Sequence, residues 1–233
     1  MSQDEYARIT ITDNSGCSAP RRGPVLYRVH VTTPAPTSLS SADAPGSSWP
    51  AVLTWRALEA PRMESVRVQM NGKRIKAAGR IIAGACDEHP AFSASYDLVT
   101  DETGVTKRLS VRAAVAAGES QISISRDSQG FWLIDSASPT RSDFDGALDT
   151  ELVWSPFFNT LAIRRLGLHT ADASDQQVPV VYVGLPDLTA RAETLSYRGG
   201  PTEFEVDSPM GHSRVTVDSE GFVVGYDGMA HRI

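Results

Sequence analysis

Residues 66–83 read VRVQMNGKRIKAAGRIIA and carry the clearest fold signal in the chain. Apolar and polar side chains alternate along residues 66–70, as on a strand that is buried on one face only. Asn71 and Gly72 follow, and this dipeptide strongly favours a two-residue turn between antiparallel strands. A second strand-like run occupies residues 74–83, so the stretch predicts a β-hairpin.

The same pattern continues through most of the chain after residue 51. Short runs with β-branched and aromatic residues are separated by Gly, Pro, Asp and Asn, which is typical of an antiparallel fold with many strands. Further predicted strands lie at 92–100, 107–115, 121–125, 131–135, 178–185, 192–198, 203–206, 214–217 and 222–226. We therefore predict an all-β domain.

Residues 32–50 read TTPAPTSLSSADAPGSSWP and have the composition of a linker. We predict an N-terminal extension at residues 1–50 and one β domain at residues 51–233. The runs at 8–11 and 25–31 could be strands that add to the edge of this domain, or segments that do not pack on it. Trp49 lies within the linker, and we expect it to be incidental to the fold.

The charge and hydropathy of the chain exclude several classes of protein. The net charge is -6, with 22 basic and 28 acidic residues, whereas nucleic-acid-binding proteins usually carry a basic face. We expect no nucleic-acid partner, although an acidic chain can still carry a local basic pocket. No window approaches the roughly 18 consecutive apolar residues of a membrane span, and residues 1–16 lack the apolar core of a signal peptide. A cytoplasmic protein is expected, and its oligomeric state stays open.

Motifs for metals, cofactors and common catalytic sites were not found in the sequence. Cys17 and Cys86 are too few for a disulfide scaffold or a zinc site, so we expect two free thiols. The five histidines show no paired spacing, and there is no nucleophile elbow, Walker loop or dinucleotide fingerprint. We therefore expect no metal and no cofactor, and we assign no catalytic residue.

Residues 149–168 interrupt the alternating pattern. Pro156 must end the preceding strand, and the apolar residues that follow it suit a short helical or irregular segment at 155–168. Alternation puts Asp149 and Glu151 on one face of that strand. If this face is buried, each carboxylate needs a partner, and Arg164 or Arg165 is the nearest supply. The cluster could be a salt-bridged plug, or the polar end of an apolar cavity in which arginine binds a phosphate, carboxylate or sugar hydroxyl.

Two other patterns have two interpretations each. DSQGF at 127–131 and DSEGF at 218–222 could be tight turns that share Asp and Gly chemistry, or traces of a duplicated β unit. The larger aromatic residues could line a hollow and stack on a sugar, or form an ordinary core. These are Trp55, Tyr96, Trp132, Trp154, Tyr197 and Tyr226.

The motif DTELVWSPFFNTLAIRRL at 149–166 resembles the signature of a bacterial family described as "putative glycolipid-binding". Supporting matches run from about residue 52 to the C-terminus: Trp55-Arg56, Glu64, Gly79, Tyr96, Gly130-x-Trp132, Tyr197 and residues 217–226. The chain departs from the family where Gly146-Ala147 replaces Gly-Cys, so no shared cysteine nucleophile or ligand is expected. Further departures are Glu151 for Asp, Phe158-Asn159 for Thr-Asn, Ala162 for Pro, and Leu195 for a Gln.

The resemblance implies a spiral antiparallel β-roll, similar to lipoprotein carrier proteins that hold acyl chains in an apolar hollow. The first functional hypothesis is a protein that binds a lipid or glycolipid-like amphiphile in this hollow, with Asn159, Arg164 and Arg165 at a charged mouth. The full predicted ligand set is Glu64, Trp132, Asp149, Glu151, Asn159, Arg164, Arg165 and Tyr197.

Two alternatives belong to other functional classes. A cofactor-free enzyme on the same roll would use Glu64, Asp149, Glu151 or Tyr197 for proton transfer. A structural or partner-binding protein would instead fill the roll with its own side chains.

Overall fold

The computed structural model describes residues 49–136, 138–172 and 174–233. The predicted strands at 8–11 and 25–31, and nearly all of the predicted linker, lie outside these ranges. The described residues belong to the compact unit Pro45–Ile233.

One sheet of fifteen strands dominates this unit, in the order β8-β7-β6-β5-β4-β3-β2-β1-β15-β14-β13-β12-β11-β10-β9. The strands are β1 Ala51–Ala57, β2 Arg62–Asn71, β3 Arg74–Ala83, β4 Phe92–Thr100, β5 Thr106–Val115, β6 Gly118–Arg126, β7 Trp132–Asp135, β8 Thr140–Ser142, β9 Asp149–Leu152, β10 Ser174–Val183, β11 Ala190–Gly199, β12 Glu203–Ser208, β13 Gly211–Val217, β14 Val223–Tyr226 and β15 Ala230–Arg232. Neighbouring strands are antiparallel except for β9 and β10, which are parallel. The predicted all-β fold is confirmed.

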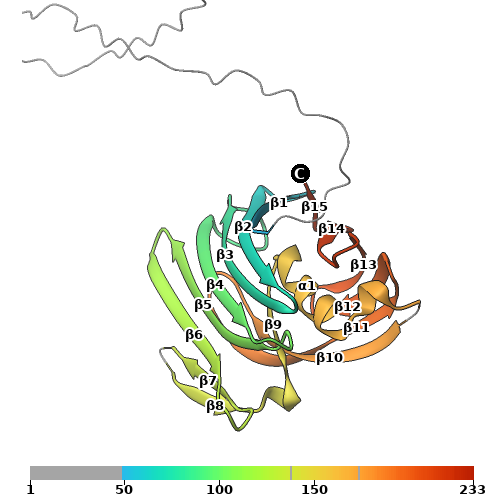
Figure 1. Ribbon diagram of the computed structural model, residues 1–233. Coiled ribbons are helices and arrows are strands. Elements are labelled where there is room, and N and C mark those ends of the chain that lie inside the picture. The colour runs from blue at the N-terminus through green and yellow to red at the C-terminus, as the bar shows by residue number, and fades with distance from the viewer. Residues whose placement is uncertain (1–48, 137, 173) are drawn as a thin grey trace, which may run out of the picture. The chain divides into compact units, whose positions relative to one another are not determined.

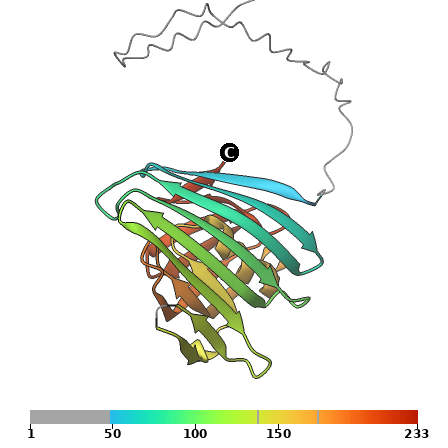
Figure 2. The same cartoon turned by 90° about the vertical axis from the view of Figure 1, so that its left-hand side faces the viewer.

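The predicted hairpin is present as β2 and β3. Asn71 pairs with Arg74, and Gly72 adopts a φ of +60°, the left-handed conformation that this turn requires. Inward side chains of β2 are buried and the intervening ones are exposed, so the sheet has an inner and an outer face. Figure 2 looks onto the outer face of β1–β6.

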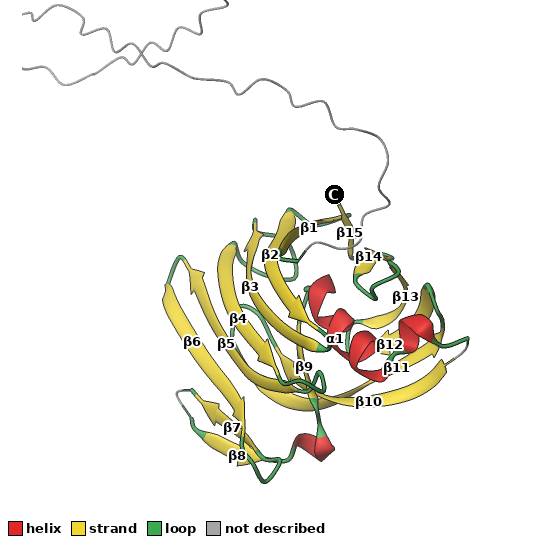
Figure 3. Cartoon of the chain, viewed as in Figure 1, coloured by secondary structure: helices red, strands yellow, loops and turns green. Residues whose placement is uncertain are grey.

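The sheet curves around one α-helix, α1 (Pro156–Leu166), which lies on its inner face (Figures 1 and 3). Pro156 occupies the first helical turn, where a missing N–H costs nothing, and Gly167 ends the helix with a φ of +70°. Phe157, Phe158 and Ile163 are at most 1% exposed, so helix side chains occupy the interior of the roll. The short helical or irregular segment predicted at 155–168 is present, and it is helical. Two short 3-10 helices, Phe144–Gly146 and Leu168–Thr170, flank this region.

The two DSxGF segments form the same turn. In each, the Asp carboxylate accepts backbone N–H groups two and four residues ahead, and the Gly has a positive φ. Asp101 makes the same bonds to Thr103 and Val105, in a turn whose sequence is DETGV. A third copy with a different sequence favours shared turn chemistry over duplication.

Candidate functional site

Glu64 is the centre of a buried polar cluster on the inner face. It lies on β2 with 2% of its surface exposed. Its carboxylate accepts hydrogen bonds from the Tyr96 hydroxyl at 2.6 Å, the Ser155 hydroxyl at 2.5 Å and the Phe157 backbone N–H at 3.4 Å. Glu64 therefore joins β2 to β4 and to the turn that begins α1.

Two local features make this arrangement possible. Gly79 pairs with Tyr96 across β3 and β4, and a Cβ atom at position 79 would lie 2.2 Å from the Tyr96 ring. The glycine therefore leaves the space in which the phenol reaches Glu64. Ser155 is the N-cap residue of α1, yet its hydroxyl does not cap the helix and donates to Glu64 instead.

Burial raises the pKa of Glu64 to about 7, despite hydrogen bonds from Ser155, Tyr96 and Phe157 and the nearby charge of Arg62, which lower it. Burial likewise raises the pKa of Tyr96 well above its usual value, so this phenol stays protonated as a donor. Glu64 is thus a buried acid that can change its charge near neutral pH.

A second part of the cluster comes from β9, whose four residues are all buried. Arg165 donates two parallel hydrogen bonds to Asp149, from Nε to Oδ1 at 3.1 Å and from a terminal nitrogen to Oδ2 at 2.7 Å. Glu151 has no arginine partner among the described residues and accepts from Asn159 Nδ2 at 3.1 Å. Tyr197 donates to Asn159 Oδ1 at 3.0 Å. Burial, followed by the charges of Glu64 and Asp149, raises the pKa of Glu151 well above its usual value.

The structure therefore brings together six of the eight predicted ligand residues, namely Glu64, Asp149, Glu151, Asn159, Arg165 and Tyr197. The predicted pairing of a carboxylate with an arginine is confirmed for Asp149 only. Arg164 points to another part of the molecule, where it donates to the Glu220 carbonyl and lies 5.0 Å from the Phe222 ring. Trp132 is buried on β7 and donates to the Ala147 carbonyl at 2.9 Å.

The hydrogen-bonding groups of this cluster are satisfied mainly by one another.

Open space lies beside the buried cluster, at the end of the roll where Trp154 joins β9 to α1. Trp154 has a φ of +62°, a conformation that costs a bulky residue about 1–3 kcal/mol. This turn directs Ser155 inward to Glu64, while the Trp154 ring packs against His89 and Phe92 with centroids 4.6 Å and 5.9 Å away.

Two pockets meet at this place. The first, the acidic pocket, has a volume of about 400 Å³; Arg62, Trp154 and Tyr226 form part of its wall. Four exposed carboxylates stand around it, those of Glu59, Asp87, Glu88 and Asp227. The Arg62 guanidinium lies 5.0 Å from the Trp154 ring centre, which is a cation–π distance.

The second, the apolar pocket, has a volume of about 520 Å³ and is lined largely by carbon. Its wall includes Ala57, Pro61, Met63, Ile82, Ala83 and Phe92. The two pockets share Ala60 and Arg62, so they adjoin.

Arg62 and the two pockets were not predicted from the sequence. Among the aromatic residues that the sequence did single out, Trp55, Tyr96, Trp132 and Tyr197 are core residues at most 2% exposed. Trp154 and Tyr226 line the acidic pocket. Trp154 precedes Ser155-Pro156, and a strand that must end at a proline is the signal that could have marked it as a turn residue.

Within the described ranges, no group of three His, Cys, Asp or Glu side chains is placed to hold a metal ion. No helix in the same residues is long and apolar enough to cross a membrane.

Comparisons with known proteins agree with the motif at 149–166. A family model described as "Putative glycolipid-binding" matches residues 52–232. A crystal structure of a DUF1089 family protein from Pseudomonas aeruginosa is similar, with a TM-score of 0.60 and 23% identity over 73% of this chain and 92% of that chain. This likeness bears on the fold alone, and no curated protein matches the chain. Because the family model covers most of the sequence, the chain belongs to the family described as "Putative glycolipid-binding".

Proposed function

We propose that the protein binds a neutral, sugar-bearing amphiphile, with the sugar in the acidic pocket and the hydrocarbon tail in the apolar pocket. The observation that carries this proposal is the meeting of two pockets of opposite character at Arg62 and Ala60. Each has a volume in the range that small-molecule sites usually have. The family description supports a binding role in general.

The chemistry of the acidic pocket favours a sugar as the polar head. Sugar hydroxyls can donate to Glu59, Asp87, Glu88 and Asp227, and the apolar face of a sugar ring can pack on an aromatic ring such as Trp154. A phosphate would meet these four carboxylates with only Arg62 to balance them. A cationic head would be repelled by the Arg62 guanidinium, which already lies over the Trp154 ring. A neutral head avoids both conflicts.

The apolar pocket suits a hydrocarbon chain. Met63 and Ile82, which line it, are 37% and 51% exposed, so covering them would remove apolar surface from water. This placement also differs from a tail buried inside the roll, where α1 side chains are already packed.

The buried cluster would then act as the frame behind the site. Glu64 fixes Ser155, and Ser155 fixes the strained turn that presents Trp154. Arg165 and Asn159 hydrogen bond to Asp149 and Glu151, and Arg164 binds a backbone carbonyl, so we assign the head contacts to Arg62 and Trp154.

Isothermal titration calorimetry with three probes of equal chain length tests this function: octyl glucoside, octyl phosphate and octyltrimethylammonium. We expect octyl glucoside to bind. Trp154→Ala should lower its affinity at least about tenfold, because a buried Trp contact commonly contributes about 2 kcal/mol or more to the binding free energy. The matched control is Trp49→Ala, which removes a Trp that stacks on Phe222 away from both pockets.

The tail contact has its own pair of variants. Ile82→Ser should weaken the binding of octyl glucoside. Val52→Ser, at a more exposed apolar position on β1 outside these two pockets, should not. Tighter binding of octyl phosphate or octyltrimethylammonium, or an equal loss in Trp49→Ala and Trp154→Ala, would contradict the proposal.

A further inference from the structure

The outer face of β1–β6, onto which Figure 2 looks, carries mostly basic charged side chains, although the chain as a whole has a charge of -6. Alternation on these strands turns six basic side chains outward, and all of them are exposed: Arg56, Arg67, Lys76, Arg80, Arg108 and Arg112. Two exposed carboxylates, those of Asp97 and Glu119, share this face.

Ion pairs among the described residues do not neutralise these six cations. None of them forms an ion pair with another described residue. Three of them have hydrogen-bond partners that are not carboxylates, namely His231 for Arg56, Gln69 for Arg67 and Gln121 for Arg112. Arg74, at the start of β3, differs because it pairs with Glu102.

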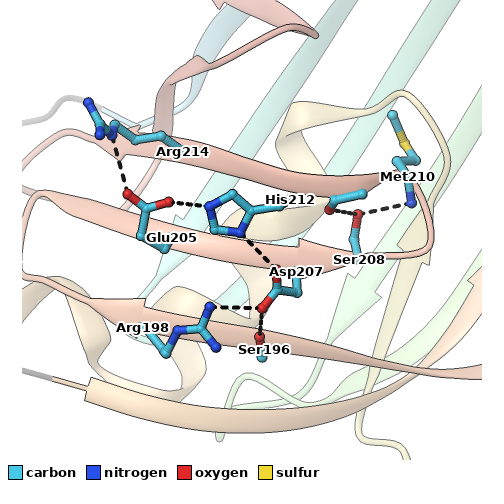
Figure 4. Close-up of polar contacts among 9 residues, drawn as sticks. Ser196, Arg198, Glu205, Asp207, Ser208, Met210, His212 and Arg214 are labelled. Carbon is cyan, nitrogen blue, oxygen red and sulfur yellow. Dashed lines mark hydrogen bonds and ion pairs between the residues drawn. The ribbon is translucent and has the colours of Figure 1, made fainter.

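The outer face of β11–β13 provides the contrast (Figure 4). There Arg198 pairs with Asp207, Arg214 lies 3.5 Å from Glu205, and His212 bridges both carboxylates at 2.7 Å and 2.8 Å. The same sheet therefore has one outer region whose charges balance internally and another whose positive charges do not.

The strand register spaces the cations over a smooth surface. One row across the sheet reads Thr54, Ser65, Arg80, Ser95, Arg112 and Gln121. Arg80 has a small serine on each side in this row, Ser65 and Ser95, which leave its guanidinium open to a ligand. At one end of the face the exposed Met63 and Ile82 lie side by side across β2 and β3, and they also line the apolar pocket.

We propose that the outer face of β1–β6 is a docking surface for an anionic lipid bilayer. Acidic headgroups complement six unpaired cations, and the apolar residues beside them suit the boundary between headgroups and acyl chains. A nucleic acid fits less well, because the outward side chains of this face include no aromatic ring on which a base could stack. This inference does not depend on the proposed sugar ligand, although it would bring the apolar pocket to the membrane.

Vesicle co-sedimentation of the full chain, without any added amphiphile, tests the surface. The probes are vesicles of phosphatidylcholine alone and vesicles that also contain phosphatidylglycerol. We expect binding to the anionic vesicles only, and weaker binding as salt is raised. Each Lys or Arg near an anionic membrane changes partitioning by about fivefold, so Arg80→Ser with Arg112→Ser should reduce binding roughly thirtyfold.

The matched control is Arg198→Ser with Arg214→Ser, which removes the same charge from the face shown in Figure 4. This control should bind the anionic vesicles like the unmodified protein. Circular dichroism of both variants checks that each keeps its strand content. Absence of binding to anionic vesicles, an equal loss in both double variants, or binding to duplex DNA in preference to the vesicles would overturn the proposal. None of these outcomes alters the octyl glucoside titration, so the two proposals fail separately.

Discussion

Replacing Glu64 with Gln should make the protein more stable at alkaline pH, although it removes a residue at the centre of a hydrogen-bonded cluster. Burial raises the pKa of Glu64 from 4.5 to about 7. The folded protein therefore binds this proton more tightly than the unfolded chain does. The stabilisation from protonated Glu64 is present below the unfolded pKa and is lost as pH rises from about 4.5 toward 7.

The size of the effect follows from the two pKa values. A difference between 4.5 and about 7 corresponds to about 3 kcal/mol of unfolding free energy, since each pH unit is worth about 1.4 kcal/mol. Glutamine stays neutral at every pH, so the unfolding free energy of Glu64→Gln does not include this pH-dependent loss. The stability of the variant relative to the unmodified protein should rise by about 3 kcal/mol between about pH 4.5 and about pH 8.

Urea denaturation at these two pH values, at constant ionic strength, measures this difference. Any packing difference between the amide and the protonated acid is present at both pH values and cancels in the comparison. Glu119→Gln, an exposed change on β6, is the control and should alter stability by less than about 0.5 kcal/mol at either pH. If the stability of Glu64→Gln relative to the unmodified protein is the same at both pH values, or falls with pH, the account of Glu64 is wrong.

Three further substitutions probe the frame of the site by urea denaturation. Arg165→Met leaves the buried Asp149 carboxylate without its ion-pair partner and should lower the free energy of unfolding by about 3–5 kcal/mol. Adding Asp149→Asn to this variant should restore part of the loss, and no restoration would mean that the two residues are not coupled. Gly79→Ala forces the Tyr96 ring away from Glu64 and should lower the free energy of unfolding by about 1–3 kcal/mol. An unchanged urea midpoint would refute the close approach of Gly79 to the Tyr96 ring. Phe157→Ala should leave a cavity and cost about 3–5 kcal/mol, and a loss below 1 kcal/mol would argue against a packed interior.

Strands with clean alternation could be predicted from the sequence, and strands without it could not. β4 has the predicted bounds, and β3 follows the predicted Asn-Gly turn. β1 has an irregular burial pattern, and β8 and β15 have only three residues each, too few for a periodic signal. The helix after Pro156 was predictable because proline both ends a strand and suits the first turn of a helix.

The site could be predicted only where its contacts are local in sequence. Asp149 and Arg165 lie sixteen residues apart on adjoining elements, and the sequence predicted Arg164 or Arg165 as the partner of a buried carboxylate there. Glu64 and Ser155 are separated by 91 residues, and only the order of strands in the sheet brings them together. Trp49 was expected to be incidental, yet it packs on Phe222 and donates to Glu220 at 3.1 Å. These residues are far apart in sequence, and they come together where the sheet places β15 between β1 and β14.

A crystal structure of the protein with octyl glucoside would locate the sugar and the alkyl chain directly. We expect the sugar ring against Trp154 and Arg62, with its hydroxyls among the carboxylates of the acidic pocket, and the octyl chain along Ile82 and Phe92. A sugar bound at another surface, or an alkyl chain that displaces α1 from the interior of the roll, would contradict the proposed function.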